Sequence, residues 1–552
     1  MVAVLVIAPG LTYGQWNAEA LKLAQVMEKV SRFYVDTIDE SAVVERTIVQ
    51  MLHELDPHSS YLSKEELEAL NEQLEGEFEG IGVSFNILED TIYIVRAISG
   101  GPSERVGITA GDRIVKVENE IVAGTGITTR DVQRLLKGAK GTRVNVSVKR
   151  RNKKELLEFN ITRDKIPVFS LDASYMVNDR IGYLKLARFS HTTIEEFEKA
   201  VKALKSKGME DLIIDLSRNG GGWLPVAVDL ADHLLSGDKE IVSTEGSRVP
   251  NRKYKARKSG LFEEGNLVIM MDGGSASASE IVSGAVQDWD RGIIVGRRSF
   301  GKGLVQQPFM LSDGSLIRLT VARYYTPTGR LIQKPYEEGY EEYAMDFINR
   351  YNQGELSSAD SIVFPPSQRY STLTMNRTVY GGGGIQPDIE IKKPTTTETT
   401  KILLNSDAFF NYATSYFYTH KSIVAASDFK LRNTDFSSLV NYLKNHHNYF
   451  ETKTEVEFNK AKQKAATENL DGNLSKSYAS LLEDIRDEKL KELEKNKQEI
   501  LEKLTEEIVK RYYFNEGMYQ QKTVFDTTIL KAVSVLNNSN EYNGTLSTGE
   551  NH

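Results

Sequence analysis

The sequence predicts a multidomain α/β protein. Its 552 residues exceed the size of one ordinary hydrophobic core and indicate three or four domains. Near the middle of the chain, short apolar runs at 211–214 and 267–271 are typical of buried strands. A charge-rich region with helical periodicity begins near residue 395. We therefore expect an α/β core over 166–394, with helical regions at both ends of the chain.

The composition excludes several classes of function. A formal net charge of -8, without a long cluster of lysine and arginine, argues against nucleic acid as a partner. Because the chain has no cysteine, it has no disulfide, no thiolate metal site and no cysteine nucleophile. Its eight histidines include no H-E-x-x-H pair, and we interpret His58 as structural. We predict no metal and no cofactor.

Residues 1–14 are apolar and are broken by Pro9 and Gly10. They resemble the apolar and cleavage regions of a secretory signal. No basic segment precedes them, so we expect a truncated signal; a short buried or membrane-associated segment is the alternative. Export predicts a location in a bacterial periplasm or cell envelope.

Residues 15–77 are expected to form an acidic helical region. Apolar side chains recur in it at helical spacing and predict a packing surface. These side chains are Leu23, Met27, Val30 and Tyr34.

Residues 78–165 are expected to form a small, mostly β module. Its glycine-rich entry, from Gly80 to Phe85, resembles the carboxylate-binding loop of a PDZ domain. The resemblance implies that backbone N–H groups capture a C-terminal carboxylate and that the next strand pairs with an extended peptide. A helix from Thr128 to Lys137 would flank the groove. The alternative is a glycine-containing strand without a ligand. The predicted peptide-binding residues are Gly80, Ile81, Gly82, Val83 and Val132.

The segment 273–280 reads Gly-Gly-Ser-Ala-Ser-Ala-Ser-Glu and follows the strand predicted at 267–271. A helical pattern begins at Ile281, so the serines lie on a turn between a strand and a helix, where small residues allow close approach. Downstream, Lys302 lies between two glycines. No histidine occurs in either segment, and a neutral lysine can act as the base of a serine nucleophile. The alternative is a flexible serine-rich turn and a solvated lysine.

A lysine base must be neutral near pH 7. This requires its pKa to fall by roughly three units, which corresponds to about 4 kcal/mol of desolvation and local field. Phe300 and the apolar strand at 293–295 are expected to bury the amine.

Together these segments resemble the C-terminal processing peptidases, or tail-specific proteases. The family signature S-A-S-A-S-E-I matches 275–281, and F-G-K-G-x-V-Q matches 300–306. The resemblance extends from about residue 30 to about residue 393. It implies a crotonase/Clp-protease-like core in which Ser277 is the nucleophile, Lys302 the base, and Gln306 the residue that orients the lysine amine.

The resemblance also implies an oxyanion hole in the glycine loop 215–222. Glycines let a backbone N–H point at the developing charge, and we expect the donors to be Gly221 or Gly222 together with Ala278. The chain departs from the family in this loop, because Ser217 and Gly220 replace the usual arginine and proline. We therefore expect a looser loop and an oxyanion hole that forms only after activation.

A phosphate-binding P-loop is a competing interpretation, because residues 296–302 fit the first seven positions of its pattern. The eighth position must be Ser or Thr to hold Mg²⁺, and it is Gly303. A strand-like stretch follows instead of a helix. We therefore reject nucleotide binding.

Residues 395–552 are expected to form a helical domain, which begins with a polar linker at 394–400. A long amphipathic helix spanning Leu481 to Ile508 is expected to pack on its own domain, and self-association into a homo-oligomer is the second interpretation. The chain after Asn537 is predicted to be disordered. Residues 334–362 are interpreted as an insertion of unknown role.

The sequence thus predicts a serine endopeptidase that selects protein substrates by their free C-terminal tails. Apolar groove residues such as Val83, Phe85 and Val132 indicate tails with an apolar end. A noncatalytic tail-binding scaffold is the main alternative. A second alternative is another acyl-transfer enzyme on a related core, since that core also hosts coenzyme-A chemistry.

Overall fold

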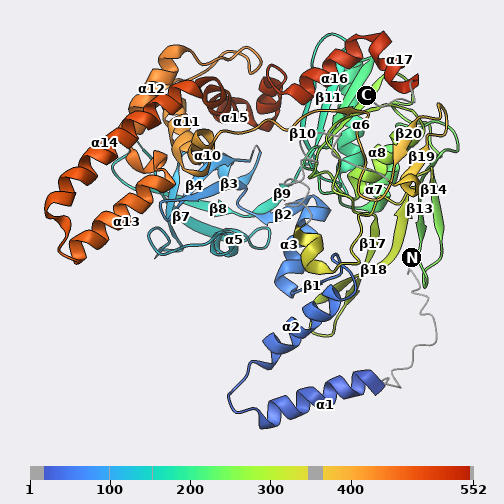
Figure 1. The fold of residues 1–552 in the computed structure, drawn as a ribbon, viewed down its shortest axis with the longest axis horizontal. Helices are drawn as coiled ribbons and strands as arrows, with labels where there is room; N and C mark the ends of the chain where they lie inside the picture. The colour runs from blue at the N-terminus through green and yellow to red at the C-terminus, as the bar shows by residue number, and fades with distance from the viewer. Residues whose placement is uncertain (1–17, 99, 152, 346–364, 548–552) are drawn as a thin grey trace. The chain divides into compact units, whose positions relative to one another are not determined.

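The computed structural model describes residues 18–98, 100–151, 153–345 and 365–547. These residues form two compact units, and Figure 1 labels many of their elements. The smaller unit contains residues 18–64 and the segments 306–320 and 336–344, and the larger unit contains the other described residues. The predicted signal segment and most of the 334–362 insertion lie outside the described residues.

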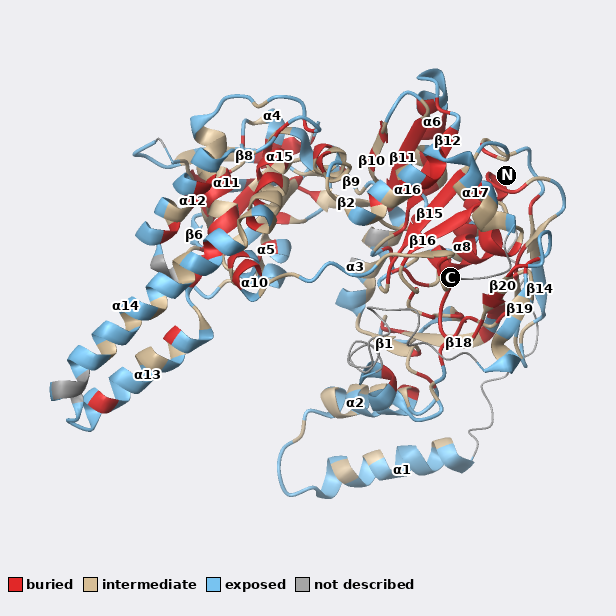
Figure 2. Cartoon of the chain, turned by 45° about the horizontal axis from the view of Figure 1, so that its top comes forward, coloured by how far each residue is buried: buried red, intermediate tan, exposed pale blue. Residues whose placement is uncertain are grey.

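The smaller unit begins with α1 (Ala18–Phe33) and α2 (Glu40–His53). The apolar stripe predicted here does not pack as expected. Within the described part of the chain α1 has no buried residue, and Figure 2 shows it mostly exposed. Leu23 is 49% exposed and Tyr34 is 59% exposed.

The rest of the smaller unit is organised around a turn at Asp56. Its carboxylate accepts hydrogen bonds from His58 N at 2.8 Å, from Ser59 N at 2.9 Å and from Thr320 Oγ1 at 3.0 Å. The turn leads into β1 (Ser60–Leu62), which pairs antiparallel with the first half of β18 (Leu316–Tyr325). These contacts give His58 a structural environment, as predicted.

The larger unit is built around a six-stranded sheet with the order β10-β11-β12-β15-β16-β21. β10 is antiparallel to β11, and the other neighbours are parallel. The strands are β10 (Leu171–Met176), β11 (Ile181–Leu186), β12 (Asp211–Asp215), β15 (Leu267–Met271), β16 (Ile293–Gly296) and β21 (Ile389–Glu390).

Both faces of this sheet are buried, as expected for a parallel sheet. Alternate residues of a strand point to opposite faces. Thus Leu267, Ile269 and Met271 contact one cluster, whereas Val268 and Met270 contact another. The first cluster contains helices α6 (Thr193–Ser206), α7 (Leu224–Asp232) and α8 (Ala278–Asp288). Figure 2 shows these central strands as the most buried part of the unit.

The second face of the sheet is covered by the end of the chain. Helices α16 (Thr527–Asn537) and α17 (Ser539–Ser547) contribute Ile529, Val535 and Tyr542 to its cluster. The prediction that the chain is disordered after Asn537 was therefore wrong for the described residues up to 547: α17 is helical, and Tyr542 is 4% exposed.

The module predicted at 78–165 is mostly β, with one flanking helix, α5 (Thr129–Leu136). β2 (Glu77–Gly80), at the start of the module, pairs antiparallel with β9 (Asp164–Pro167) at its end. A separate sheet has the order β3-β4-β5-β7-β8, and β6 pairs with β5. Its strands are β3 (Val83–Leu88), β4 (Thr91–Ala97), β5 (Arg113–Val117), β6 (Glu120–Ile121), β7 (Arg143–Lys149) and β8 (Leu157–Thr162).

The helical region after the linker has its own core, in which Leu493, Ile500, Leu504 and Ile508 are buried. The long amphipathic helix therefore packs on its own domain, as predicted. It is, however, divided at Asn496. The helices are α10 (Glu398–Asn405), α11 (Ala408–Thr419), α12 (Asn433–Asn445), α13 (Lys453–Thr467), α14 (Asp471–Lys495) and α15 (Lys497–Lys522).

The remaining elements complete the larger unit and its connections. The second half of β18 pairs with β13, and β13 pairs with β14. The bounds are α3 (Lys64–Glu75), α4 (Pro102–Arg105), β13 (Glu240–Glu245), β14 (Arg252–Lys255), β17 (Leu304–Met310), β19 (Arg369–Ser371) and β20 (Thr378–Tyr380). None of the described helices has both the length and the apolar character of a membrane span.

Candidate active site

Ser277 lies at a sharp elbow between β15 and α8. Its backbone has φ 54° and ψ -112°, a conformation that a residue with a side chain rarely adopts. Such strain persists where the surrounding structure holds it, and it is common at functional sites. The elbow places Ser277 at the N-terminus of α8, where the first backbone N–H groups have no partner within the helix.

The three serines of the elbow have different surroundings. Ser275 is buried and donates its hydroxyl to Leu216 O at 2.9 Å. Ser279 is also buried and donates to Asn219 O at 2.8 Å. Ser277 is only half-buried. Two of the three hydroxyls therefore hold the elbow to the loop after β12, and the middle serine is the one that a substrate can reach.

Lys302 lies on the loop between β16 and β17, and it is half-buried. Phe300 N donates to Ser275 O at 2.9 Å, so this loop runs directly beside the elbow. The chain after Gly303 continues as β17 and not as a helix. This agrees with the rejection of a P-loop.

Glu280 joins the serine elbow to the lysine loop. One oxygen of its carboxylate accepts hydrogen bonds from Ser277 N at 2.7 Å and from Lys302 N at 2.9 Å. The other accepts from Gly301 N at 2.7 Å and from Ser299 Oγ at 2.5 Å. Burial raises the pKa of Glu280 to about 7, and these four donors oppose the rise by stabilising the ionised form. The carboxylate thus fixes the backbone of both proposed catalytic residues.

Tyr324 makes a second link between the two segments. Its hydroxyl donates to the carbonyl oxygen of Ser277 at 3.2 Å and to that of Lys302. The ring is 1% exposed and lies in the main core cluster. The backbone of Ser277 and that of Lys302 are therefore held by two buried side chains from different elements.

The glycine loop after β12 packs against the elbow at Gly221. A Cβ atom on Gly221 would lie 2.9 Å from Ser277 Cβ and 3.0 Å from Ala278 N. Gly222 instead packs on Phe189, where a Cβ would lie 2.0 Å from the carbonyl oxygen. Of the two predicted loop donors, Gly221 is therefore the one beside Ser277 and Ala278.

The amide of Gly221 is already occupied in this structure. Its N–H donates to Asn219 Oδ1 at 2.9 Å. Asn219 is fully buried, and its own carbonyl accepts from Ala276 N at 3.0 Å. An oxyanion hole that uses Gly221 therefore needs its amide to turn away from Asn219, and formation of the hole on activation stays a prediction.

Gln306 lies in the smaller unit. Its side-chain amide donates to His58 O, and the ring of His58 is hydrogen-bonded to Tyr343 Oη at 2.7 Å. The predicted role of Gln306 in orienting the Lys302 amine stays a prediction.

The predicted peptide-binding residues lie together in the β module, at the start of β3 and on α5. Gly82 has φ 72°, which favours glycine, and its carbonyl accepts from Ile98 N at 2.9 Å. Val83 is partly exposed, whereas the side chains of Ile81 and Val132 are buried in the core of the module. A peptide can contact Val132 only if the space between β3 and α5 opens, so its role stays a prediction.

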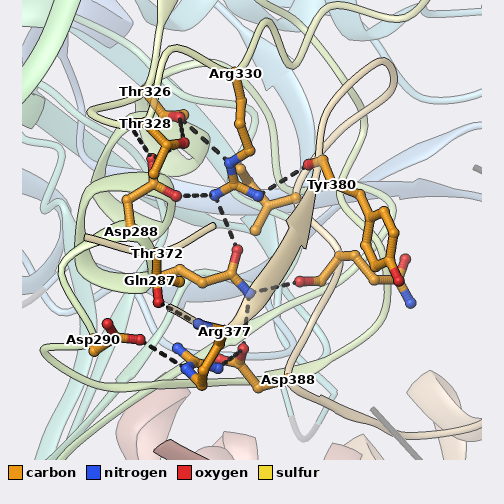
Figure 3. Close-up of polar contacts among 12 residues, drawn as sticks. Gln287, Asp288, Asp290, Thr326, Thr328, Arg330, Thr372, Arg377, Tyr380 and Asp388 are labelled. Carbon is orange, nitrogen blue, oxygen red and sulfur yellow. Dashed lines mark hydrogen bonds and ion pairs between the residues drawn. The ribbon is translucent and has the colours of Figure 1, made fainter. Parts of the chain in front are cut away.

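The C-terminal end of α8 is anchored by a buried polar cluster (Figure 3). Arg330 is fully buried; it donates to Gln287 Oε1 at 3.1 Å and to Asp288 Oδ1 at 2.5 Å. Asp288 Oδ2 also accepts from Thr328 N at 2.9 Å. Nearby, Arg377 forms ion pairs with Asp290 and Asp388. This cluster fixes the helix whose other end carries Ser277.

Comparison with known proteins assigns three parts of the chain to families. Residues 180–340 match peptidase family S41, and residues 80–161 match the PDZ domain. Residues 399–536 match a family described as "Probable PDZ-protease, C-terminal helical domain". The carboxy-terminal-processing protease of Bartonella bacilliformis is 34% identical over 339 residues, which cover 60% of this chain and 77% of that protein.

This chain belongs to the carboxy-terminal processing proteases of family S41.

Other carboxy-terminal processing proteases give similar matches. CtpB of Bacillus subtilis is 32% identical over 317 residues, which cover 57% of this chain and 65% of that protein. Among solved structures, the photosystem II D1 C-terminal processing protease is 26% identical and covers 68% of this chain and 94% of that chain, with a TM-score of 0.36. The predicted family and fold class, an α/β serine protease with a PDZ domain and a helical C-terminal domain, are thus confirmed.

Sequence reasoning gave no role to Glu280, Asn219 or Tyr324. Glu280 and Asn219 lie inside the motifs on which the resemblance to the carboxy-terminal processing proteases rests. A glutamate three residues after the N-cap residue of a helix typically accepts a hydrogen bond from the backbone N–H of that N-cap residue. That signal could have identified Glu280 as a ligand of the Ser277 amide. Tyr324 carries no comparable signal, because its partners are backbone carbonyls distant in the sequence.

Proposed function

We propose that this chain is a serine endopeptidase that binds the free C-terminal tail of a protein substrate and cleaves it through an acyl-enzyme on Ser277 and Lys302. The observation that carries the proposal is the environment of Ser277. It is the half-buried serine of an elbow whose other two hydroxyls are committed to backbone carbonyls. A strained backbone at the start of a helix presents that hydroxyl to a substrate.

In this mechanism Lys302, in its neutral form, accepts the proton of the Ser277 hydroxyl as the oxygen attacks the peptide carbonyl. Lys302 then returns the proton to the leaving amine, and water hydrolyses the ester by the reverse sequence. The amides of Ala278 and Gly221 hold the negative oxygen of each tetrahedral intermediate. Because each oxyanion donor contributes about 10²- to 10³-fold to kcat, the bond between Gly221 and Asn219 makes the resting enzyme slow.

Substrate selection in this proposal belongs to the PDZ domain. The backbone around Gly80 and Gly82 captures the terminal carboxylate, and the tail adds to the edge of β3. Val83 and Phe85 are only partly buried and offer an apolar surface to the last side chains. We further infer that the protein acts in a bacterial periplasm or cell envelope, which rests on the apolar sequence of residues 1–14.

The test compares wild type with Ser277→Ala and Lys302→Ala on an unfolded protein that ends in an apolar tail. Ser283→Ala is the matched control, because this serine is on the same helix and donates only within it, to Ser279 O at 2.8 Å. We expect cleavage by wild type and by the control, and none by the two site variants. Normal cleavage by Ser277→Ala would refute the assignment.

A second arm tests tail recognition. The same substrate, amidated at its C-terminus, should be cut more slowly, because the amide removes the charge that the PDZ loop captures. If wild type binds the free tail and cuts neither substrate, the chain is a tail-binding scaffold.

A further inference from the structure

A buried ion pair lies beneath the start of the oxyanion loop. Lys185 on β11 and Asp215 at the end of β12 are each 4% exposed, and Lys185 Nζ lies 3.1 Å from Asp215 Oδ1. The same amine donates to the carbonyl oxygen of Ser217, two residues into the loop. Lys185 therefore holds both the carboxylate and the backbone of the turn that leads to Gly221.

Asp215 accepts two further hydrogen bonds, one from the same turn and one from β11. Its Oδ1 accepts from Ser217 N at 2.8 Å, and its Oδ2 accepts from Tyr183 Oη at 2.6 Å. Burial alone would raise the pKa of Asp215, but Lys185, Tyr183 and Ser217 outweigh burial, and the pKa lies below its usual range. The carboxylate is thus ionised and fully paired.

The end of helix α15 closes this cluster. The ring of Tyr519 lies under the Lys185 amine, 5.9 Å from ring centroid to Nζ, and 6.4 Å from the ring of Tyr183. Tyr175 Oη donates to the backbone oxygen of Tyr519 at 2.9 Å, which anchors the helix to β10. One turn earlier, Asn515 Nδ2 donates to Asp172 Oδ1 at 3.0 Å.

This arrangement matters because a buried charge must be both paired and shielded. A lysine amine over an aromatic ring gains up to about 2 kcal/mol when water is excluded. Removing the ring would admit water to the ion pair and weaken its hold on Ser217. Lys185 on β11 thus supplies a cation that holds the turn, and the C-terminal helical region supplies its aromatic cover.

We propose that Lys185 and Tyr519 are positioning residues of the oxyanion loop, so that helix α15 takes part in ordering the catalytic site. This inference rests on the proposed peptidase function. Neither side chain touches the substrate. Each acts through the Asp215–Ser217 turn on the amide of Gly221. Because displacement of a catalytic group by about 1 Å can lower a rate about 10²-fold, a loosened loop lowers kcat and leaves tail binding unchanged.

The experiment measures kcat and KM on a peptide with an apolar tail, together with the affinity of a peptide boronic acid whose tetrahedral adduct occupies the oxyanion hole. We expect Tyr519→Leu to lower kcat by about 10- to 100-fold and to lower the affinity for the boronic acid by a similar factor. KM should stay within about twofold of the wild-type value. Tyr519→Phe keeps the ring and should behave as wild type.

Tyr513→Leu is the matched control, because Tyr513 lies just before the kink of α15 at Phe514 and donates to Ile423 O at 3.0 Å, away from the loop. If Tyr519→Leu fails to fold, Tyr175→Phe decides, since it removes only the hydroxyl that holds Tyr519 O. We expect it to lower kcat severalfold. If both Tyr519→Leu and Tyr175→Phe have the kcat of wild type, the inference is overturned. If Tyr519→Leu does not fold, a wild-type kcat in Tyr175→Phe alone overturns it. The proposed function would stand as long as Ser277→Ala is inactive.

Discussion

Gly221 faces the side chain of Ser277 so closely that a Cβ atom on the glycine would lie 2.9 Å from Ser277 Cβ. The loop after β12 and the elbow after β15 therefore meet at a position that has no room for a side chain. The strand order explains this contact. β12 and β15 are adjacent and parallel, so the segments that follow them emerge at the same edge of the sheet.

Gly221→Ala should abolish most of the activity. Gly221 has φ 102°, which an alanine adopts only with strain, and the new methyl group would press on Ser277 and Ala278. We expect kcat to fall by at least about 10²-fold, the contribution of one oxyanion donor. Peptide kinetics on purified, folded protein measure this. Gly220→Ala is the control, because a Cβ there meets nothing within 4 Å. Equal activity of the two variants would contradict the assignment of Gly221.

Glu280→Gln should lower kcat by about 10- to 100-fold, because its amide nitrogen cannot accept hydrogen bonds from the backbone of the elbow or of the lysine loop. Glu457→Gln, on a residue whose side chain is 72% exposed, should leave kcat unchanged. Peptide kinetics at pH 8 measure both. An unchanged kcat in Glu280→Gln would show that the carboxylate does not position Ser277 and Lys302.

The stability of the protein should also depend on pH through Glu280. Burial raises its pKa from 4.5 to about 7, so the folded state binds the proton more tightly than the unfolded chain. The stabilisation from this group is complete below pH 4.5 and is lost as the pH rises through about 7. The unfolding free energy of wild type relative to Glu280→Gln should fall by about 3 kcal/mol over this range, as measured by urea denaturation. A constant difference would disprove the raised pKa.

Arg330→Met should destabilise the fold by about 3–5 kcal/mol, because it leaves the buried carboxylate of Asp288 without its ion pair. Chemical denaturation measures this loss. Lys202→Met removes an exposed ion pair with Glu198 and should change stability by less than about 1 kcal/mol. If both variants are equally stable, the cluster in Figure 3 does not anchor α8.

Tyr542→Phe should weaken the attachment of α17. The hydroxyl accepts from Leu267 N at 3.0 Å and donates to Leu267 O at 3.2 Å, so its loss removes two hydrogen bonds to the buried backbone of β15. We expect a loss of about 1–3 kcal/mol and faster hydrogen exchange at β15. Tyr478→Phe on the helical domain is the control. Unchanged exchange at β15 would show that α17 does not protect the sheet.

Local patterns in the sequence predicted the elements that carry the active site. The apolar run 267–271 followed by small residues and a helical pattern indicated the elbow, and the structure has β15, Ser277 and α8 there. The choice of Gly221 over Gly222 could not be predicted, because it depends on packing between segments more than 50 residues apart. The bond from Gly221 to Asn219, in contrast, spans two residues, and an asparagine in a glycine-rich turn is a local signal that was missed.

Two features that differ from what the sequence pattern suggested have a common physical cause. The stretch after Asn537 is polar and gave no helical stripe, yet it is fixed by Tyr542 against Leu267. Val132 has the helical spacing of a groove residue, yet it is fully buried in the core of the PDZ domain. Periodicity reports which residues share a face of a helix, but it does not report whether that face meets a ligand or the protein's own core.

The position of α16 and α17 on the sheet has a consequence for synthesis. A chain that has emerged from the ribosome as far as residue 393 contains every strand of the core sheet, including β21 (Ile389–Glu390). One face of that sheet still lacks the cover formed by Ile529, Val535 and Tyr542. Domains generally fold as they are translated. This sheet, however, cannot bury its second face until residues 527–547, which form α16 and α17, have also been made.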